Sequence, residues 1–469
     1  SPEIGGKSDR RIVFLFTGQG SQYRNMGADL YRTNPVFRAA LDRCDELLRP
    51  HWERSLIALL YGDEGTDAAL NEARHTQPVI FAVEYALAKL LESWGIKPSL
   101  VMGHSIGEYV AATLAGIFEP EEALGLVAAR GRLVQSLPQN GGMAVIAADE
   151  ERVREALEGC RGKVSIAAVN APRNTVVSGE KEAIGELCTR FRKQRVASHL
   201  LNVSHAFHSC LLDPVVEAFG TLALGVRYSP PRLPIMADTT GRLGGAELAT
   251  PGYWTRQLRE PVRFCDGMRA IGEAGYGIFV EVGGTSMLTS LGRQCLPDHQ
   301  GLWLSTLGSR DFSANLRPGR IEGQSDWQPI LDCLAGLYKA GCDIDWEAFD
   351  HPYPRKKVLL PNYPFQRKRC WIDLPGPRET EAAPRRAEPA GTILREAGVL
   401  QPRGGEGEGG DLIGRQLELI SRQRRMLSEQ LNVLRGAGKG APTEPFSHHQ
   451  ASPVGNRDGN GRARGQKPL

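Results

Sequence analysis

The chain has 469 residues, 41% of them hydrophobic, which is typical of a globular protein with two or three domains. Its 57 basic and 54 acidic residues leave a formal net charge of +3, and this balance argues against nucleic acid as a partner. No apolar run reaches the about 20 residues that cross a bilayer, so no membrane association is expected. The nine cysteines are scattered singly, without zinc-type spacing, which predicts reduced thiols, a cytoplasmic location and no bound metal.

Short β-rich runs alternate with amphipathic stretches from about residue 12 onward. The runs at 11–16 and 100–102 predict strands, and the stretch at 77–92 predicts a helix. Strands and helices that alternate at this spacing indicate an α/β fold with a mainly parallel sheet. Residues 1–11 precede the first strand and are interpreted as an N-terminal linker.

Residues 141–205 follow an order of their own, β-α-β-β-α-β, which is that of a ferredoxin-like unit. We expect a small subdomain here whose two ends lie close together, inserted between residues 12–140 and 206–310 of a larger, hydrolase-like subdomain. The predicted strands are 143–147, 164–170, 174–179 and 198–203, and the predicted helices are 149–159 and 181–194.

The composition changes after Trp371 to Pro, Glu, Arg, Ala and then Gly, which predicts a disordered linker over 376–410. Apolar residues at spacings of three and four predict an amphipathic helix over 411–436. This helix is interpreted as a docking element, a coiled coil, or a helix folded back on its own domain. Residues 437–469 predict a disordered tail.

The strongest local signal is the sequence Gly-His-Ser-Ile-Gly at 103–107. It follows the apolar run 99–102 and precedes the helix-like stretch 108–116, which is the strand-turn-helix context of a nucleophilic serine. At a helix start, the amide of Ile106 can face the oxyanion that forms when Ser105 attacks a carbonyl. The alternative interpretation is a capping serine in a tight turn.

A serine hydroxyl needs a base, and His205 and His208 are the best candidates. Both lie in the segment 203–209, where the inserted subdomain returns to the large one, a place where clefts form. We expect one of them to face Ser105. The alternative is that both are structural.

Arg130 lies late in an otherwise apolar helical stretch. Its planar fork would bind a substrate carboxylate through two hydrogen bonds, or it would cap carbonyls at the helix end, and both interpretations stay open at this point. The glycine-rich segment 18–23 lacks the last glycine of a dinucleotide fingerprint, so no bound nucleotide cofactor is expected.

Together these residues resemble the acyltransferase domain of modular type I polyketide synthases and the related malonyl-CoA:acyl-carrier-protein transacylases. The resemblance extends over about 12–371, with the motifs in family order. They are Phe16–Gln22, Thr76–Pro78, Gly103–Glu108, Arg130–Gly131, Asn170–Pro172, His205–His208 and Leu360–Arg367.

The resemblance implies that Ser105 is acylated and that His208 is the base. A main-chain carbonyl would orient His208, with Gln257 at the matching position. The amides of Gln19 and Ile106 would form the oxyanion hole. The implied substrate-binding positions are Arg130, at the acyl carboxylate, and Gln77, His104, Asn170 and His205 elsewhere in the pocket.

The motif His205–His208 resembles the malonyl-selecting form of the family, because Phe207 would crowd a 2-methyl group. Such discrimination is worth only about 1 to 3 kcal/mol, so a methylmalonyl-selective enzyme is an alternative. Residues 281–285 depart from the family pattern by lacking proline after the first glycine, and we attach no function to this.

The implied reaction is ping-pong transfer of malonyl from malonyl-CoA to the phosphopantetheine thiol of an acyl carrier protein. Residues 360–371 resemble the linker after such domains, so 311–375 is interpreted as a post-acyltransferase linker and a ketosynthase is expected as a further partner. The main rival is a serine hydrolase or editing thioesterase, although neither an acidic third member nor an H-G-G-type loop is evident. A second rival is an idle scaffold built around the helix at 411–436.

Overall fold

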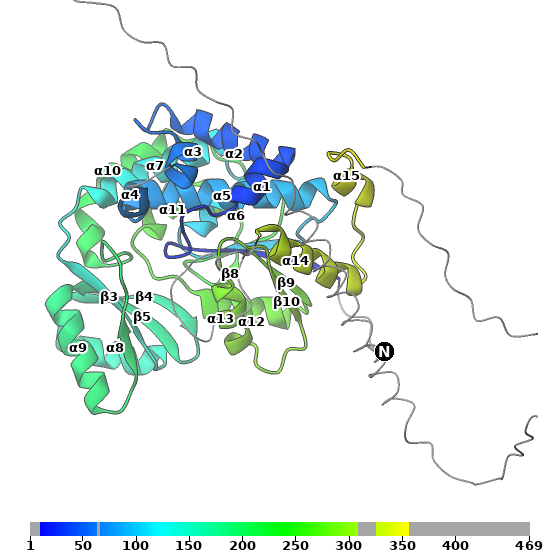
Figure 1. The fold of residues 1–469 in the computed structure, drawn as a ribbon. Helices are drawn as coiled ribbons and strands as arrows, with labels where there is room; N and C mark the ends of the chain where they lie inside the picture. The colour runs from blue at the N-terminus through cyan, green and yellow to red at the C-terminus, as the bar shows by residue number, and fades with distance from the viewer. Residues whose placement is uncertain (1–9, 63–65, 161, 308–324, 356–469) are drawn as a thin grey trace, which may run out of the picture. The chain divides into compact units, whose positions relative to one another are not determined.

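The computed structural model describes residues 10–62, 66–160, 162–307 and 325–355. These residues form a large, mainly parallel sheet covered by helices and a separate small antiparallel sheet (Figure 1). The predicted α/β fold class is confirmed. The predictions for 376–410, 411–436 and 437–469, and the motif at 360–367, lie outside the described residues.

The large sheet consists of β1 (Ile12–Phe16), β2 (Leu100–Gly103), β7 (Ile235–Ala237), β8 (Arg242–Leu243), β9 (Ile278–Val282) and β10 (Leu302–Ser305). Its order is β10-β9-β1-β2-β7-β8, with every pair parallel except β7 and β8. Every residue of β1, β2 and β9 is buried, as expected for strands with helices on both faces. Because β10, β9, β1, β2 and β7 run parallel, their carboxyl ends lie at the same edge of the sheet, where ligands bind in open α/β sheets.

Helices cover both faces of this sheet. Figure 1 shows α5 (Ala73–Ser93), α6 (Gly107–Leu114) and α7 (Pro120–Gln135) on one face and α12 (Phe264–Glu273) and α13 (Met287–Cys295) on the other. The remaining helices are α1 (Ala28–Thr33), α2 (Pro35–Leu48), α3 (Leu56–Tyr61), α4 (Thr66–Leu70), α10 (Asp213–Leu224), α11 (Pro251–Gln257), α14 (Trp327–Lys339) and α15 (Trp346–Asp350). Short 3₁₀ turns occur at Glu158–Cys160, Cys210–Leu212 and Ala246–Ala249.

Several predicted segments differ in extent from the observed ones, among them the strand predicted at 198–203, which is the shorter Ser198–Leu200. The helix predicted at 77–92 is the longer α5, and that predicted at 108–116 is the shorter α6. Part of the expected linker at 311–375 forms α14 and α15. Ile330 and Leu334 of α14 are buried in the main core, so this stretch packs as part of the large subdomain.

The small subdomain contains β3 (Gly141–Ile146), α8 (Glu150–Leu157), β4 (Val164–Ala171), β5 (Asn174–Glu180), α9 (Lys181–Lys193) and β6 (Ser198–Leu200). Its strands are antiparallel in the order β4-β5-β3-β6, which is the predicted ferredoxin-like arrangement. The N–H of Leu201 donates to the carbonyl of Met143 at 2.9 Å, so the chain enters and leaves this subdomain side by side.

A short bridge joins the two subdomains. The N–H of Val169 in β4 donates to the carbonyl of Val262 at 2.8 Å, and the N–H of Val262 donates to the carbonyl of Ala167 at 2.9 Å.

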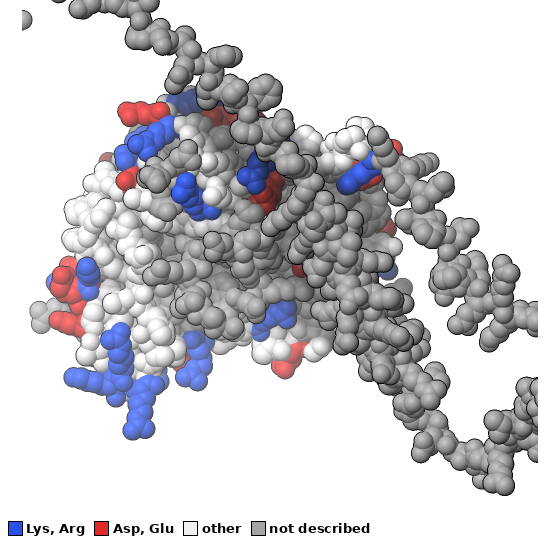
Figure 2. Space-filling view, in the orientation of Figure 1, with Lys and Arg blue, Asp and Glu red and all other residues white. Residues whose placement is uncertain are grey.

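Basic side chains gather at the end of the small subdomain that carries the last turn of α9. This turn contains Arg190, Arg192 and Lys193, and Figure 2 shows the gathered basic side chains. Within the described residues, no helix combines the length and apolar character needed to cross a membrane.

Candidate active site

Ser105 lies in the tight turn between β2 and α6. Its φ is 55°, in the left-handed region that residues with a Cβ rarely adopt. A Cβ at Gly103 would lie 2.1 Å from the nitrogen of Glu108, and one at Gly107 would lie 2.4 Å from the carbonyl oxygen of Phe16. Only glycine fits at both positions, so the two flanking glycines let the chain turn and present the serine hydroxyl.

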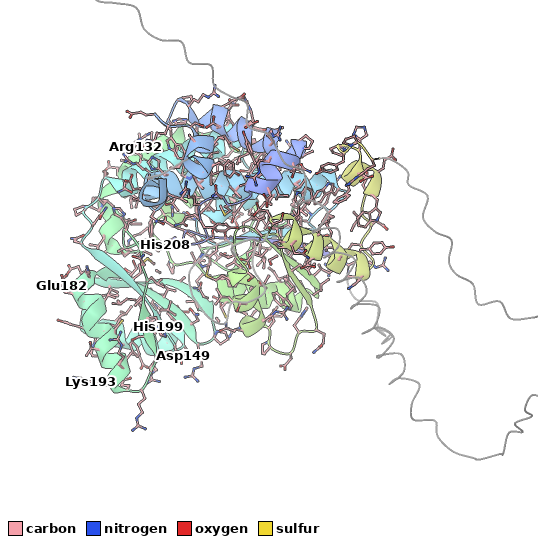
Figure 3. The ribbon with its side chains drawn as sticks, viewed as in Figure 1. Arg132, Asp149, Glu182, Lys193, His199 and His208 are labelled. Atoms are coloured by element: carbon pink, nitrogen blue, oxygen red, sulfur yellow. The ribbon has the colours of Figure 1, made fainter. Side chains whose placement is uncertain are left out.

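His208 is the histidine that faces the serine. Its Nε2 lies 2.7 Å from Ser105 Oγ, and its Nδ1 lies 2.7 Å from the carbonyl oxygen of Glu260. Burial, with Arg130 nearby, lowers the pKa of His208 to about 3, so the ring is neutral near pH 7. A neutral ring whose Nδ1–H donates to a carbonyl leaves Nε2 free to accept the serine proton. Figure 3 shows His208 where the small sheet meets the helices of the large subdomain.

The prediction that a carbonyl orients His208 agrees with this geometry, but the placement at Gln257 is wrong. The carbonyl belongs to Glu260, just beyond the end of α11, where carbonyls lack helical partners. Gln257 Nε2 instead donates to the carbonyl oxygen of Ser105 at 2.8 Å and to Asp238 Oδ2 at 3.2 Å. Gln257 therefore supports the serine and not the histidine.

The two predicted oxyanion-hole residues lie beside the serine turn, Gln19 in the loop after β1 and Ile106 at the start of α6. Among the described residues, the amide of neither one donates a hydrogen bond within the protein. The loop after β1 is held in place by Glu84 of α5. The N–H of Thr17 donates to Glu84 Oε1 at 2.8 Å, and the hydroxyl of Thr17 donates to the same oxygen. Both amides thus remain available to an oxyanion.

Arg130 is buried in α7 with only 1% of its surface exposed. Its Nη1 donates to Gln77 Oε1 at 2.8 Å. In the part of the chain that the structure describes, Nε and Nη2 have no hydrogen-bond partner within bonding geometry, although the hydroxyl of Tyr109 lies close to the guanidinium. Buried charges are normally paired, so the open side of this fork suits an incoming carboxylate.

The remaining predicted pocket residues divide into two pairs. His104 Nε2 lies 2.8 Å from Asn170 Oδ1, and burial lowers the pKa of His104, so its ring is neutral. Asn170 ends β4, which brings the small subdomain against the serine turn. His205 lies 3.2 Å from the carbonyl oxygen of Leu137 and stands edge-on to the buried ring of Phe207. These contacts hold His205 against Leu137 and Phe207 and not against the serine.

Sequence reasoning missed a buried pair of carboxyl groups beneath the serine. Asp238 Oδ2 accepts the N–H of Ser105 at 3.0 Å, and the N–H of Asp238 donates to Glu108 Oε1 at 2.9 Å. The signal was present, because Asp238 follows the apolar run 235–237 and so stands at the carboxyl end of a parallel strand. Among the described residues, no set of His, Cys, Asp and Glu is arranged to hold a metal ion.

Comparison with known proteins decides the family, because residues 13–314 match the model of the acyl transferase domain. The chain belongs to this acyltransferase family. The acyltransferase is 39% identical over 373 residues to polyketide synthase GfsA of Streptomyces halstedii, an alignment that covers 77% of this chain and 5% of that synthase. The chain thus spans a small part of that relative.

Solved structures agree with this assignment. The acyltransferase domain from the second module of the salinomycin polyketide synthase matches with a TM-score of 0.66 and 37% identity, covering 72% of this chain and 76% of that one. A chain of the PlMCAT:AntF complex, a type II polyketide synthase acyl-carrier protein with its malonyl-transacylase, matches with a TM-score of 0.59 and 29% identity, covering 64% and 96%. The acyltransferase is therefore of the modular type I polyketide synthase kind.

Proposed function

We propose that this acyltransferase moves a malonyl group from malonyl-CoA to Ser105 and then to the phosphopantetheine thiol of an acyl carrier protein. The observation that carries the proposal is the 2.7 Å contact between Ser105 Oγ and Nε2 of the neutral His208 ring. The guanidinium of Arg130 lies nearby, with only Nη1 hydrogen-bonded, to Gln77. The family membership supports the reaction class. The relative solved with its acyl-carrier protein supports the acceptor.

In the first half-reaction, His208 Nε2 takes the proton of Ser105 as Oγ attacks the thioester carbonyl of malonyl-CoA. The amides of Gln19 and Ile106 stabilise the oxyanion of the tetrahedral intermediate. The carbon–sulfur bond then breaks, and the CoA thiolate leaves with the proton from His208. The product is a malonyl ester on Ser105.

In the second half-reaction, the carrier's thiol gives its proton to His208 and attacks the ester. The bond between the acyl carbon and Ser105 Oγ breaks, and His208 returns the proton to that oxygen. Arg130 holds the malonyl carboxylate through both steps, so the acyl carbon stays where a thiol can approach. No bound cofactor takes part in this scheme.

Selection of malonyl over methylmalonyl is proposed to depend on Phe207, whose ring is 7% exposed and packs against the core. We place the reaction in the cytoplasm, where the unpaired cysteines would stay reduced.

A ketosynthase is a further proposed partner, because residues 360–367 resemble the linker of this family.

The proposal is tested by mixing the protein with malonyl-CoA and measuring its intact mass, followed by addition of a phosphopantetheinylated carrier protein. We expect a malonyl adduct on Ser105 that moves to the carrier. Release of free malonate, with no adduct and no transfer, would support the serine hydrolase rival. A greater amount of acyl-enzyme from methylmalonyl-CoA than from malonyl-CoA would support the alternative of a methylmalonyl-selective enzyme.

A further inference from the structure

The peptide groups on both sides of Ser105 are held by two buried side chains. Asp238 Oδ2 accepts the N–H of Ser105 at 3.0 Å, and Gln257 Nε2 donates to its carbonyl oxygen at 2.8 Å. Gln257 also donates to Asp238 at 3.2 Å, which closes a ring around the nucleophile's backbone. Asp238 and Gln257 are 1% and 0% exposed, so water does not compete for these bonds.

This ring holds a backbone conformation that is unfavourable by itself. Ser105 has a φ of 55°, and such a conformation persists only where the surrounding structure enforces it. The same conformation sets the direction of the Cα–Cβ bond, and thus the 2.7 Å contact between Ser105 Oγ and His208. Weakening the ring would let the serine relax and lengthen that contact.

The charge of Asp238 is set by its neighbours. Glu108 and Tyr109 face it from α6, Arg130 from α7 and Tyr253 from α11. Two adjoining buried carboxyl groups do not both ionise readily. Burial, followed by repulsion from Asp238, raises the pKa of Glu108 well above its ordinary value, which favours its protonated form.

Asp238 is the member of the pair that ionises. Burial raises its pKa as well, but the hydrogen bonds from Glu108, Gln257 and the N–H of Ser105, together with the charge of Arg130, favour its ionised form. A charged acceptor binds an N–H about twice as strongly as a neutral one.

We propose that Asp238 is a positioning residue for Ser105: its carboxylate holds the serine N–H and, through Gln257, the serine carbonyl, and so keeps Oγ aimed at His208. The inference rests on the proposed function only in taking Ser105 as the nucleophile. Its consequence is that the reactivity of Ser105 falls as Asp238 becomes protonated. His208 does not cause that fall, because its pKa is lowered to about 3.

The test uses a fluorophosphonate probe, which needs a reactive serine but no acyl-CoA. Ser105 Oγ bonds to phosphorus, the phosphorus–fluorine bond breaks, fluoride leaves, and His208 takes the serine proton. The labelling rate of the full chain is measured from about pH 5 to 9. In Asp238→Asn, we expect the rate at pH 8 to fall roughly 10- to 100-fold and the decrease toward acid to disappear.

Two further variants separate positioning from folding. Gln257→Met removes the bond to the serine carbonyl, so we expect a smaller loss of rate with the acid decrease retained. Glu281→Gln changes another buried carboxyl, which accepts from Thr285 and Thr289 and does not contact the serine turn. We expect it to label at the wild-type rate with the wild-type pH profile.

A folded Asp238→Asn protein with the wild-type rate and pH profile would overturn the inference. If that variant does not fold, a wild-type rate in Gln257→Met would overturn it instead, and a slowed rate that Glu281→Gln does not share would support it. A wild-type chain that the probe does not label would overturn it too. Labelling of the wild type without any acylation by malonyl-CoA would refute the proposed function alone.

Discussion

The two sheets of the acyltransferase differ in what they bury. The large subdomain buries several ionisable side chains, among them Glu84, Glu108, Arg130, His208, Asp238 and Glu281. Within 141–200, which spans the strands and helices of the small subdomain, the buried polar side chains of the described residues are uncharged: Thr175, Ser178 and Ser198. Its charged side chains, including Glu182 and Lys193, project from the outer surface (Figure 3).

The difference suggests separate roles for the two subdomains, with the proposed reaction in the large one and a supporting role for the small one. Ionisable groups whose pKa is shifted by burial cluster at functional sites, and Glu108, Arg130, His208 and Asp238 gather around the serine turn, which supports the proposal that the reaction takes place there. The small sheet has its own apolar core around Ile184 and Leu187, and it reaches the site through Asn170. It therefore contacts the residue next to Ser105, whereas the large subdomain carries the groups that we propose react, Ser105 and His208.

The largest expected effect comes from removing the nucleophile. Ser105→Ala leaves no hydroxyl for His208 to activate, so acylation by malonyl-CoA should fall at least about 10⁴-fold. Intact mass after incubation measures the loss. Ser136→Ala is the control, because its hydroxyl caps the end of α7 by donating to Leu133. Persistent acylation of Ser105→Ala would place the nucleophile elsewhere.

Arg130→Ala tests whether the buried charge serves the substrate. We expect malonyl transfer to fall roughly 100- to 1000-fold, because the malonyl carboxylate would be buried without its partner. Fluorophosphonate labelling of Ser105 should be affected far less. Arg132→Ala, on the exposed side of the same helix, is the matched control. Undiminished malonylation of Arg130→Ala would rule out the carboxylate clamp.

Ile184→Ala tests the supporting role of the small subdomain. Ile184 is fully buried in the small core, so its truncation should lower the free energy of unfolding by about 2 to 5 kcal/mol. Urea denaturation measures this loss. Under native conditions the labelling rate of Ser105 should stay near the wild-type value. A large loss of labelling in the folded variant would show that the two subdomains are not separable in this way.

Glu281→Gln tests the stability cost of the acids in the large subdomain. Burial raises the pKa of Glu281 from its ordinary 4.5 to about 7. The folded state therefore keeps a proton that the unfolded state releases, and the free energy of unfolding should fall by about 3 kcal/mol between pH 4.5 and 7. The variant should lack this fall. Urea denaturation at several pH values measures both proteins. If the free energy of unfolding changed with pH equally in the wild type and in Glu281→Gln, the raised pKa would be contradicted.

The smallest expected effect concerns selectivity. If Phe207 adjoins the acyl group as proposed, Phe207→Ser should open space there and shift the preference for malonyl-CoA over methylmalonyl-CoA roughly 10- to 100-fold toward methylmalonyl. Competition between the two thioesters, read by the mass of the acyl-enzyme, measures the shift. An unchanged ratio would assign selection to other residues.

The parts predicted from the sequence are those with local causes. The serine turn follows from a strand, two glycines with no room for a Cβ and a helix, all within the stretch 99–116. The small subdomain follows from the periodicity of residues 141–205. From their position where the chain re-enters the large subdomain, one of His205 and His208 was expected to face Ser105, the family resemblance pointed to His208, and the structure places His208 in contact with the serine.

Tertiary structure alone decided which distant groups support the nucleophile. Asp238 and Gln257 lie more than a hundred positions along the chain from Ser105, and parallel strands bring them together through crossovers that no short window of sequence reveals. The same holds for Glu260, whose main-chain carbonyl leaves no mark on residue identity. Local sequence thus determined where the nucleophile stands, whereas long-range packing determined its charge environment, because burial and pairing exist only in the folded chain.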